Sequence, residues 1–191
     1  LEGDLKSDSG RQDLLLNIAR EVPGAYVPHF YSAAYQADGT LAAFHPNADV
    51  PPRIRRVFAP DVSRIPTETT ILTEQTTFDA AYLVEVSRGC PHGCRFCSAG
   101  YIYRPPRFRP LELLKTQLER GGAHTDRVGL VGAAVSDLPE LAALCRHGAG
   151  TGLKLSFSSL RADALEGPLI EQLQRSRVKT ATIAPDAGSE R

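Results

Sequence analysis

The chain has 191 residues, 42% of them hydrophobic and 23% charged, and its 22 basic side chains balance 22 acidic ones. This composition is that of an ordinary globular protein and excludes collagen-like, disordered and membrane-spanning chains. No basic stretch followed by a hydrophobic core marks a signal peptide in this sequence. Because the sequence contains no Met and begins with Leu1, we interpret it as a fragment that lacks its native N-terminus.

The even balance of charge conceals a difference between the two parts of the chain. Residues 1–80 contain 7 basic and 11 acidic side chains, whereas residues 81–191 contain 15 and 11. The second part holds a run of arginines with no acidic residue between them: Arg88, Arg95, Arg104, Arg107 and Arg109. Two interpretations remain open, namely solvated or packing arginines, and an electropositive mouth for a carboxylate, a phosphate or a nucleic acid.

The first part of the sequence predicts one helix and one hairpin. Apolar side chains recur at helical spacing over residues 13–20, and Pro23-Gly24 ends the pattern. An aromatic stretch at residues 26–35 leads to the turn Asp38-Gly39 and a second apolar segment at residues 41–44, which is a hairpin signal. Five prolines then indicate an extended segment without a core of its own.

After this region, short apolar segments alternate with helical patterns. The segments are Tyr82–Val86, Val128–Val135, Leu153–Phe157 and Val178–Ala184. This alternation is typical of an α/β protein with a parallel sheet. For the helices between them, we expect Pro110 at a first helical position, Asp137 and Glu140 as an N-terminal capping pair, and a third helix that starts near Pro168.

The chain is too short for a closed eight-stranded barrel of such units, which needs about 250 residues. We therefore expect two regions. Residues 1–80 form a connector, and residues 81–191 form the N-terminal half of a partial (βα) TIM-like barrel that is truncated after about four strands. In such barrels the chemistry lies just after the carboxyl end of each strand.

Three of the four cysteines follow the first predicted strand in a C-x3-C-x2-C pattern, as Cys90, Cys94 and Cys97. Gly89 and Gly93 let the backbone curl so that the three thiolates surround one compact object. An iron–sulfur cube is such an object, and three ligands leave one of its four irons open. Clustered cysteines in a chain with so few of them indicate metal binding in a reducing compartment, so we expect a cytoplasmic protein without a membrane partner.

Two other kinds of metal site compete with this interpretation. Zinc could be held by the three cysteines together with His92 or a distant residue, although no second pair of ligands follows downstream. An electron-transfer cluster would need a fourth thiolate. Cys145 is the only cysteine left, and its place on an apolar helix pattern predicts a buried core thiol instead.

The cysteine loop is one of several segments that match a known pattern: Glu85–Cys97, Ala99–Pro105, Val128–Ser136, Ser156–Asp163 and Thr180–Arg191. Together they resemble the radical S-adenosylmethionine (radical SAM) superfamily, and within it the proteins associated with cobalamin-binding domains. The resemblance implies a 4Fe-4S cluster on the three cysteines, S-adenosylmethionine on the open iron, and cobalamin bound through a domain outside this chain. It also implies an external reductant such as flavodoxin or ferredoxin.

The resemblance assigns ligand-binding roles to residues after the first two strands. Phe96 would lie beside the adenine, with ordinary core packing as the alternative. Gly132 and Ala133 occupy the place of a segment that meets the methionine amino group in many members. The acidic residue of that segment is missing here, which leaves Ser136 and Asp137 as polar substitutes, although Asp137 is better explained as a helix cap.

Further roles are implied after the third and fourth strands. Ser158, Ser159 and Arg161 would hydrogen-bond the methionine carboxylate or the ribose, because Arg offers a bidentate fork for a carboxylate. Each is equally well explained as a surface-loop residue. Asp186 would face the ribose hydroxyls, in place of a longer glutamate. His92, between two cysteines, could reach the cluster edge or the groups around it, but we expect it to be exposed, and the other histidines to be structural.

The function that follows is that of a radical SAM enzyme. Its cluster reductively cleaves S-adenosylmethionine to a 5′-deoxyadenosyl radical, which abstracts hydrogen from an unknown substrate. One alternative is a radical SAM methyl- or methylthio-transferase acting on RNA, which the run of arginines and the turn Pro185–Arg191 would favour. An alternative of another class is a zinc-stabilised binding module, and metal content separates the two classes.

Overall fold

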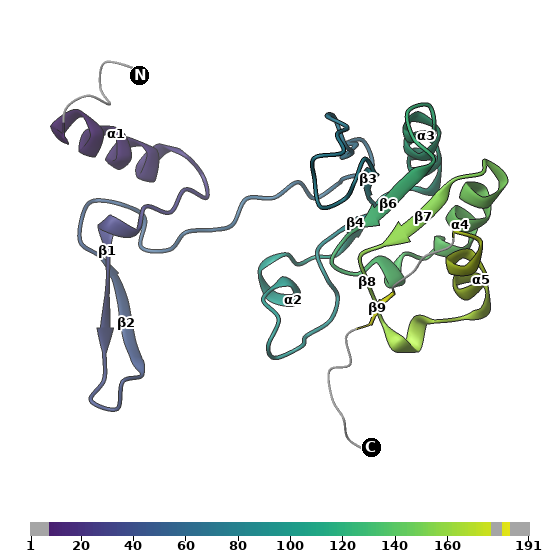
Figure 1. Ribbon diagram of the computed structural model, residues 1–191. Helices are drawn as coiled ribbons and strands as arrows, with labels where there is room; N and C mark the ends of the chain where they lie inside the picture. Colours follow the sequence, from purple (N-terminus) through teal and green to yellow (C-terminus); the bar gives the residue numbers. More distant parts are fainter. Residues whose placement is uncertain (1–7, 177–180, 184–191) are drawn as a thin grey trace. The chain divides into compact units, whose positions relative to one another are not determined.

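The chain forms two compact units that meet in sequence between Ala59 and Pro60. The computed structural model describes residues 8–176 and 181–183, and Figure 1 draws their helices and strands. Within these described ranges, none of the helices combines the length and the apolar character that crossing a membrane requires.

The first unit contains one helix and one hairpin, as the sequence predicts. Helix α1 is Asp8–Glu21, which begins five residues before the predicted pattern because its first turn is polar. A short 3-10 turn, Pro28–Phe30, leads into strand β1, Tyr31–Tyr35, which pairs antiparallel with strand β2, Leu41–Pro46. The hairpin prediction is therefore confirmed.

A small apolar core and a ring stack hold this unit together. Ala19 of α1 is buried with Phe30, Tyr31 and Val50. The rings of Tyr31 and Phe44 stack across the hairpin, with centroids 5.5 Å apart and planes 3° from parallel. Cross-strand aromatic pairs of this kind stabilise a two-stranded sheet that has no other partner in the unit's described residues.

The second unit is built on a parallel sheet with the strand order β3-β6-β7. Its strands are β3 (Tyr82–Glu85), β6 (Arg127–Val131) and β7 (Lys154–Phe157). Two short pairs form separate two-stranded sheets: β4 (Ser87–Arg88) runs antiparallel to β5 (Arg107–Phe108), and β8 (Ser159–Leu160) runs parallel to β9 (Thr182–Ile183). The predicted parallel α/β sheet is confirmed, and closure into part of a barrel remains a prediction.

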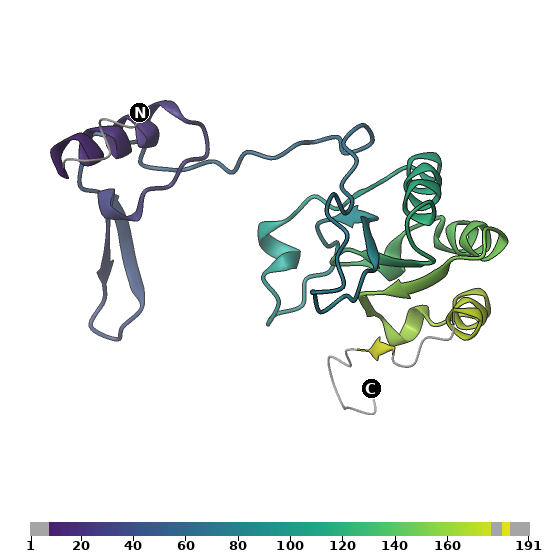
Figure 2. The same ribbon diagram turned by 45° about the horizontal axis from the view of Figure 1, so that its top comes forward.

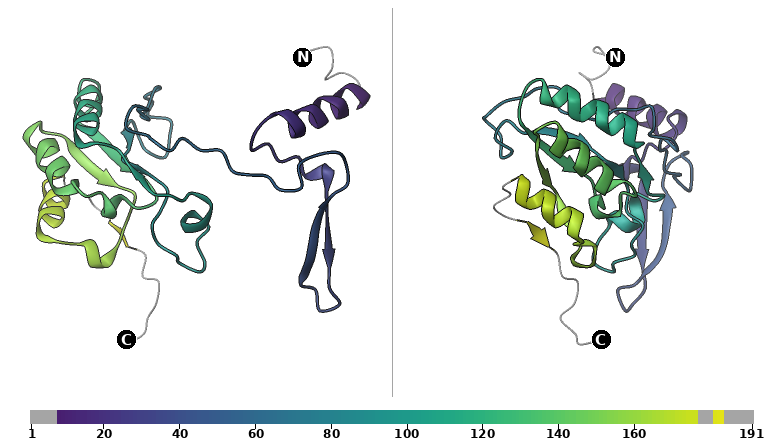
Figure 3. Two further views of the ribbon diagram at one scale, coloured as in Figure 1. Left: turned by 180° about the vertical axis from the view of Figure 1, so that it is seen from behind. Right: turned by 90° about the vertical axis from the view of Figure 1, so that its right-hand side faces the viewer.

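Helices follow the strands in alternation. They are α2 (Ala99–Ile102), α3 (Leu111–Gly122), α4 (Leu141–Gly150) and α5 (Gly167–Arg175), with 3-10 turns η3 (Val135–Asp137) and η4 (Ala162–Ala164). Figures 2 and 3 show α3, α4 and α5 side by side in chain order along one face of the sheet. The apolar faces of these helices pack on the sheet and form the core of the unit. This core includes Leu114, Leu118 and Leu144 from the helices and Val84 and Leu130 from the sheet.

Two predicted element boundaries are wrong, and both errors affect the site. The apolar run that began at Val128 ends as a strand at Val131, and Val135 belongs to η3 instead. The Asp137–Glu140 pair does not cap a helix, because α4 begins only at Leu141 and has no side-chain cap bond. Pro110 stands one residue before α3, whereas α5 starts beside Pro168 as expected.

Residues 62–69 are part of the second unit and pack along its first strand. The amide of Thr69 donates to the carbonyl of Leu83 over 2.9 Å, and the amide of Glu85 donates to that of Thr67 over 3.0 Å. These bonds cover the outer edge of β3, which would otherwise present unpaired backbone groups.

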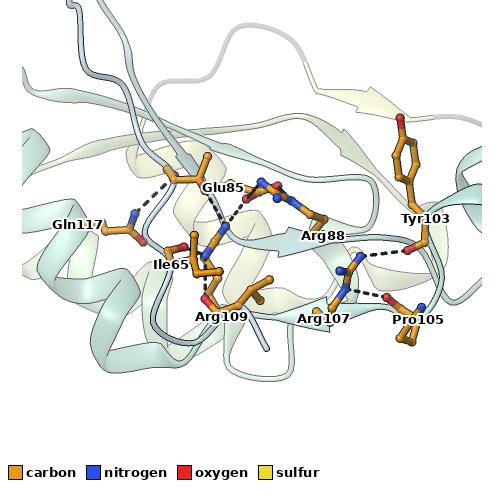
Figure 4. A network of polar contacts seen from close by, with 10 residues as sticks. Ile65, Glu85, Arg88, Tyr103, Pro105, Arg107, Arg109 and Gln117 are labelled. Atoms are coloured by element: carbon orange, nitrogen blue, oxygen red, sulfur yellow. Dashed lines mark hydrogen bonds and ion pairs between the residues drawn. The ribbon is translucent and has the colours of Figure 1, made fainter. Parts of the chain in front are cut away.

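A buried arginine ties the same segment to the sheet (Figure 4). The Arg109 side chain is fully buried; it donates to the carbonyls of Val62, at 2.9 Å, and Ile65, and it pairs with Glu85. Glu85 also pairs with Arg88 at 2.8 Å. A buried guanidinium needs such partners, since an unpaired charge in the interior is strongly unfavourable.

Two of the five arginines of the run are buried, whereas Arg88, Arg95 and Arg104 are exposed. Arg107 is also buried and donates to the carbonyl of Pro105 over 3.0 Å, and Arg104 donates to the carbonyl of Pro91 over 2.6 Å. The interpretation as packing arginines holds for Arg107 and Arg109, and an electropositive mouth for an anionic ligand remains a prediction for the exposed members of the run.

Candidate functional site

A cleft of about 520 Å³ lies where the loops after β4, β6 and β8 meet. Because β4 and β8 follow β3 and β7 after one residue each, these loops lie beyond the carboxyl ends of the neighbouring strands β3, β6 and β7, where α/β proteins carry their ligand sites. The lining combines the three clustered cysteines with residues of two later loops: Cys90, His92, Cys94, Phe96, Cys97, Ala133, Ala134, Ser136, Asp137, Leu160, Arg161, Ala162 and Asp163. The structure thus brings together residues more than 70 positions apart.

The cysteine loop begins with a sharp turn that only glycine allows. Gly89 has a φ of +90°, and a Cβ on it would lie 2.1 Å from the carbonyl oxygen of Tyr103. A side chain is therefore excluded both by conformation and by space. The turn leaves Cys90 buried and directs the chain around the cleft, where the amide of Cys97 bonds to the carbonyl of Cys94 over 3.1 Å.

The outer side of the loop packs closely against helix α2. A Cβ on Gly100 would lie 1.9 Å from the carbonyl oxygen of His92. The hydroxyl of Tyr101 donates to the carbonyl of Gly93 over 3.0 Å. Together with the bond from Arg104 to the loop, these contacts fix the backbone that carries the cysteines.

The three thiols suit a cluster ligand set. The four cysteines, all of which are described, form no disulfide. Nowhere in the described ranges do three His, Cys, Asp or Glu side chains form a group that could hold a metal ion. Cys90, Cys94 and Cys97 instead line the wall of one cleft, and a 4Fe-4S cube takes its thiolates at separate corners. Three thiols on one cleft are the donor set that such a cluster takes.

The fourth cysteine has a different environment. Cys145 is buried in α4, and burial raises the pKa of its thiol to about 12. A thiol with so high a pKa stays protonated at neutral pH and is a poor metal ligand. The prediction of a buried core thiol is confirmed.

A polar network of His92, Asp137 and Arg161 lines the cleft. Asp137, on η3, places one carboxylate oxygen 2.7 Å from Nε2 of His92 and the other 2.6 Å from Nη1 of Arg161. Arg161 also pairs with Asp163, and the bonds from Arg161 lower the pKa of that exposed carboxyl. The backbone amide of Arg161 donates to Oγ of Ser136 over 3.0 Å. The loop that follows β6 and the loop that follows β8 are thus bonded to each other.

The predicted ligand-binding residues divide into groups. Phe96, Ala133 and Arg161 line the cleft, and Phe96 is 73% exposed, so core packing does not explain it. Gly132 and Ser158 do not line it. Oγ of Ser158 donates to the carbonyl of Gly132 over 3.0 Å, and a Cβ on Gly132 would lie 2.6 Å from Oγ of Ser87, so both serve local packing.

Two predicted residues cannot be assigned in this way. Ser159 lies in β8, and nothing further is described of its side chain. Asp186 lies outside the described residues.

Sequence reasoning misjudged two members of the network. We expected His92 to be exposed, but it is partly buried and bonded to Asp137 and Arg161. Asp137 does not cap a helix as predicted: it is the last residue of η3, three residues before the N-cap of α4, and it lines the cleft. The available signal was the position of Asp137 after the second strand, which sequence alone assigns equally to a cap.

Comparison with known proteins identifies the fold family. The model of the radical SAM superfamily matches residues 84–191, which is more than half of the chain and includes all three clustered cysteines. The chain belongs to the radical SAM superfamily. The predicted resemblance is confirmed at this level.

One relative of this radical SAM chain is an uncharacterised protein of Methanocaldococcus jannaschii. The two are 42% identical over 121 residues, which are 62% of this chain and 27% of the relative. The chain therefore spans about a quarter of the length of that relative.

Proposed function

We propose that this chain carries the part of a radical SAM enzyme that holds a 4Fe-4S cluster and S-adenosylmethionine. The observation that supports this most strongly is the cleft itself, where Cys90, Cys94 and Cys97 face a single space at the carboxyl ends of parallel strands. When bound and reduced, a cluster with one open iron supplies an electron for radical chemistry on S-adenosylmethionine.

The chain's own residues hold and shield these groups. Cys90, Cys94 and Cys97 would provide the three thiolates. The exposed ring of Phe96 offers an apolar face for the adenine, and the small side chain of Ala133 leaves room for a ligand beside it. Arg161 provides a guanidinium for a carboxylate, which would have to share it with Asp137 and Asp163.

The proposal is tested by electron paramagnetic resonance of the whole chain after anaerobic reconstitution with iron and sulfide. We expect a reduced 4Fe-4S signal after dithionite, which shifts when S-adenosylmethionine is added. Cys94→Ala should abolish the signal. Cys145→Ala is the matched control, because it removes a thiol outside the cleft, and it should leave the signal intact.

Two results would contradict the proposal. Zinc at one equivalent with no cluster would favour the binding module, and a cluster whose signal does not respond to S-adenosylmethionine would indicate electron transfer. The hydrogen-donating substrate, a reductant such as flavodoxin or ferredoxin, and a cobalamin-binding domain elsewhere remain predictions. The RNA transferase alternative also remains a prediction, since Arg107 and Arg109 are buried but Arg88, Arg95 and Arg104 are exposed.

A further inference from the structure

We infer that Asp137 is a positioning residue for the cysteine loop, a role that rests on the proposed function of the cleft. Asp137 would fix the position of the loop by joining His92, which lies within the loop, to Arg161, which follows β8. Three thiolates must be held within about 0.5 Å of the required geometry to share one cluster. The loop therefore needs fixed points on both of its sides.

One side of the loop is fixed by its own neighbours in sequence. Arg104 donates to the carbonyl of Pro91 over 2.6 Å, and Tyr101 donates to that of Gly93 over 3.0 Å. Both contacts come from within about fifteen residues of the loop. They fix it to α2 but provide no bond to the loops that follow β6 and β8.

The other side is bonded to those loops through Asp137. Its two carboxylate oxygens serve different partners, Oδ2 facing Nε2 of His92 at 2.7 Å and Oδ1 facing Nη1 of Arg161 at 2.6 Å. Nη1 of Arg161 also lies 2.8 Å from Nε2 of His92, but an Nε2 that donates to Asp137 has no lone pair left to accept from that guanidinium, so the carboxylate joins the two side chains. The side chain of Asp137 is 18% exposed, so these charge-assisted bonds lie in a partly desolvated site where they are stronger than at a surface.

The neighbouring carboxylate lacks this bridging geometry. Asp163 pairs with Arg161 as well, but its side chain is 67% exposed and its bonds to that arginine come from the turn that follows it. The two aspartates thus offer a comparison within one network. Loss of Asp137 should release the loop, whereas loss of Asp163 should leave the bridge to His92 in place.

The test measures the reactivity of Cys90 in the whole chain without a cluster. Iodoacetamide is added to the reduced protein, and the modification of each cysteine is followed by mass spectrometry. Cys145 serves as an internal reference, because it is buried in α4 and reacts only when the core opens. We expect Asp137→Ala to raise the rate at Cys90 about tenfold, as loss of a charge-assisted bond predicts, with Cys145 unchanged.

Matched variants make the result specific. His92→Ala should raise the rate at Cys90 as much as Asp137→Ala. The double variant should add little, because each single substitution already removes the bond between His92 and Asp137. Asp137→Asn keeps an acceptor for His92 and should restore most of the protection. Asp126→Ala removes a surface carboxylate that pairs with Lys154 and should change nothing.

Several outcomes would overturn the inference. They are an unchanged rate at Cys90 in both Asp137→Ala and His92→Ala, additive effects in the double variant, or an equal rise in Asp163→Ala. Should Asp137→Ala also expose Cys145, His92→Ala and Asp137→Asn decide the result instead. In chains that bind a cluster, weaker cluster retention in Asp137→Ala than in Asp163→Ala would add a second, spectroscopic readout.

The two proposals fail in distinguishable ways. Absence of a cluster in the wild-type chain would contradict the proposed function, yet the alkylation rates of the cluster-free protein would still measure the bridge. Conversely, a wild-type cluster together with unchanged Cys90 reactivity in the variants would leave the proposed function standing and remove the role of Asp137.

Discussion

At the scale of single residues, the ion pair between Glu85 and Arg109 gives the clearest prediction for stability. The Arg109 side chain is fully buried, and Glu85 is the acidic group that the structure places on it. Glu85→Gln should lower the free energy of unfolding by about 3 kcal/mol, because it leaves a buried charge uncompensated. Urea unfolding followed by circular dichroism measures this.

The control is Glu112→Gln. Glu112 pairs with Lys115 on the surface of α3, where its side chain is 81% exposed, so the change should be within about 0.5 kcal/mol. Equal effects of the two substitutions would show that burial of the pair does not matter, contrary to the structure.

The same carboxylate predicts a dependence on pH. Burial raises the pKa of Glu85, but bonds from Arg88 and Arg109 outweigh it, so the folded pKa is below 4.5, its ordinary value. Its stabilisation is therefore fully present above pH 4.5 and is lost as the pH falls through the lower folded pKa. The stability difference between the wild type and Glu85→Gln should shrink toward pH 3, and a difference that grows on acidification would contradict this.

Gly89 gives a further prediction, which separates the cost of a left-handed backbone conformation from the cost of a steric collision. Gly89→Ala would place a methyl group at φ +90° and 2.1 Å from the carbonyl oxygen of Tyr103. We expect a loss of more than about 2 kcal/mol in the free energy of unfolding, together with poor cluster uptake. Gly152 has a φ of +76° and open space around it, so Gly152→Ala should cost only about 1 kcal/mol. Similar costs at both positions would exclude the collision.

What the sequence reveals at this scale depends on the kind of interaction. The spacing of Cys90, Cys94 and Cys97 is local, and it predicts a shared site that the structure places in one cleft. The bonds of Asp137 and Arg109 join residues 24 to 47 positions apart, and no local pattern encodes them. Asp137 was mistaken for a cap because a cap and a network carboxylate look alike in sequence.

At the scale of secondary-structure elements, periodic burial decides both the fold and its stability. Leu144 is fully buried where α4 packs into the core of the second unit. Leu144→Ala should cost about 3 kcal/mol in the free energy of unfolding, since it leaves a cavity against the sheet. Ile170 on α5 is 42% exposed, so Ile170→Ala should cost less than about 1 kcal/mol. Urea unfolding compares them, and equal losses would contradict the assigned core.

Elements with strong periodicity were predictable, and those set by context were not. The hairpin, α3, α4, α5 and the three strands of the sheet follow from apolar spacing and turn residues. The short strands β4, β5 and β8 have two residues each, which is too few for a period to appear, whereas β9 lies within the predicted segment Val178–Ala184. They form because the loops that bear the cleft are brought together by the larger elements.

At the scale of the whole molecule, the boundary between the two units lies earlier than the predicted connector ends. The sequence changes its rhythm near residue 80, where strand and helix patterns begin, but the units divide between Ala59 and Pro60. An extended segment such as residues 62–69 has no period of its own, so its attachment to β3 and Arg109 is invisible in the sequence.

This attachment leads to a prediction about truncated chains. A chain of residues 60–191 keeps the backbone bonds between Thr67, Thr69 and β3, and it keeps the carbonyls that pair with Arg109. A chain of residues 81–191 loses them, so the edge of β3 is exposed and a buried guanidinium lacks most of its partners. We expect residues 60–191 to unfold cooperatively in urea and to protect Cys145 from alkylation. The free energy of unfolding of the shorter chain should be lower by about 3–5 kcal/mol, which is the cost of breaking a buried charge network. Comparable stability and equal Cys145 protection in the two chains would show that residues 60–80 do not stabilise the second unit. That result would support the predicted connector, residues 1–80.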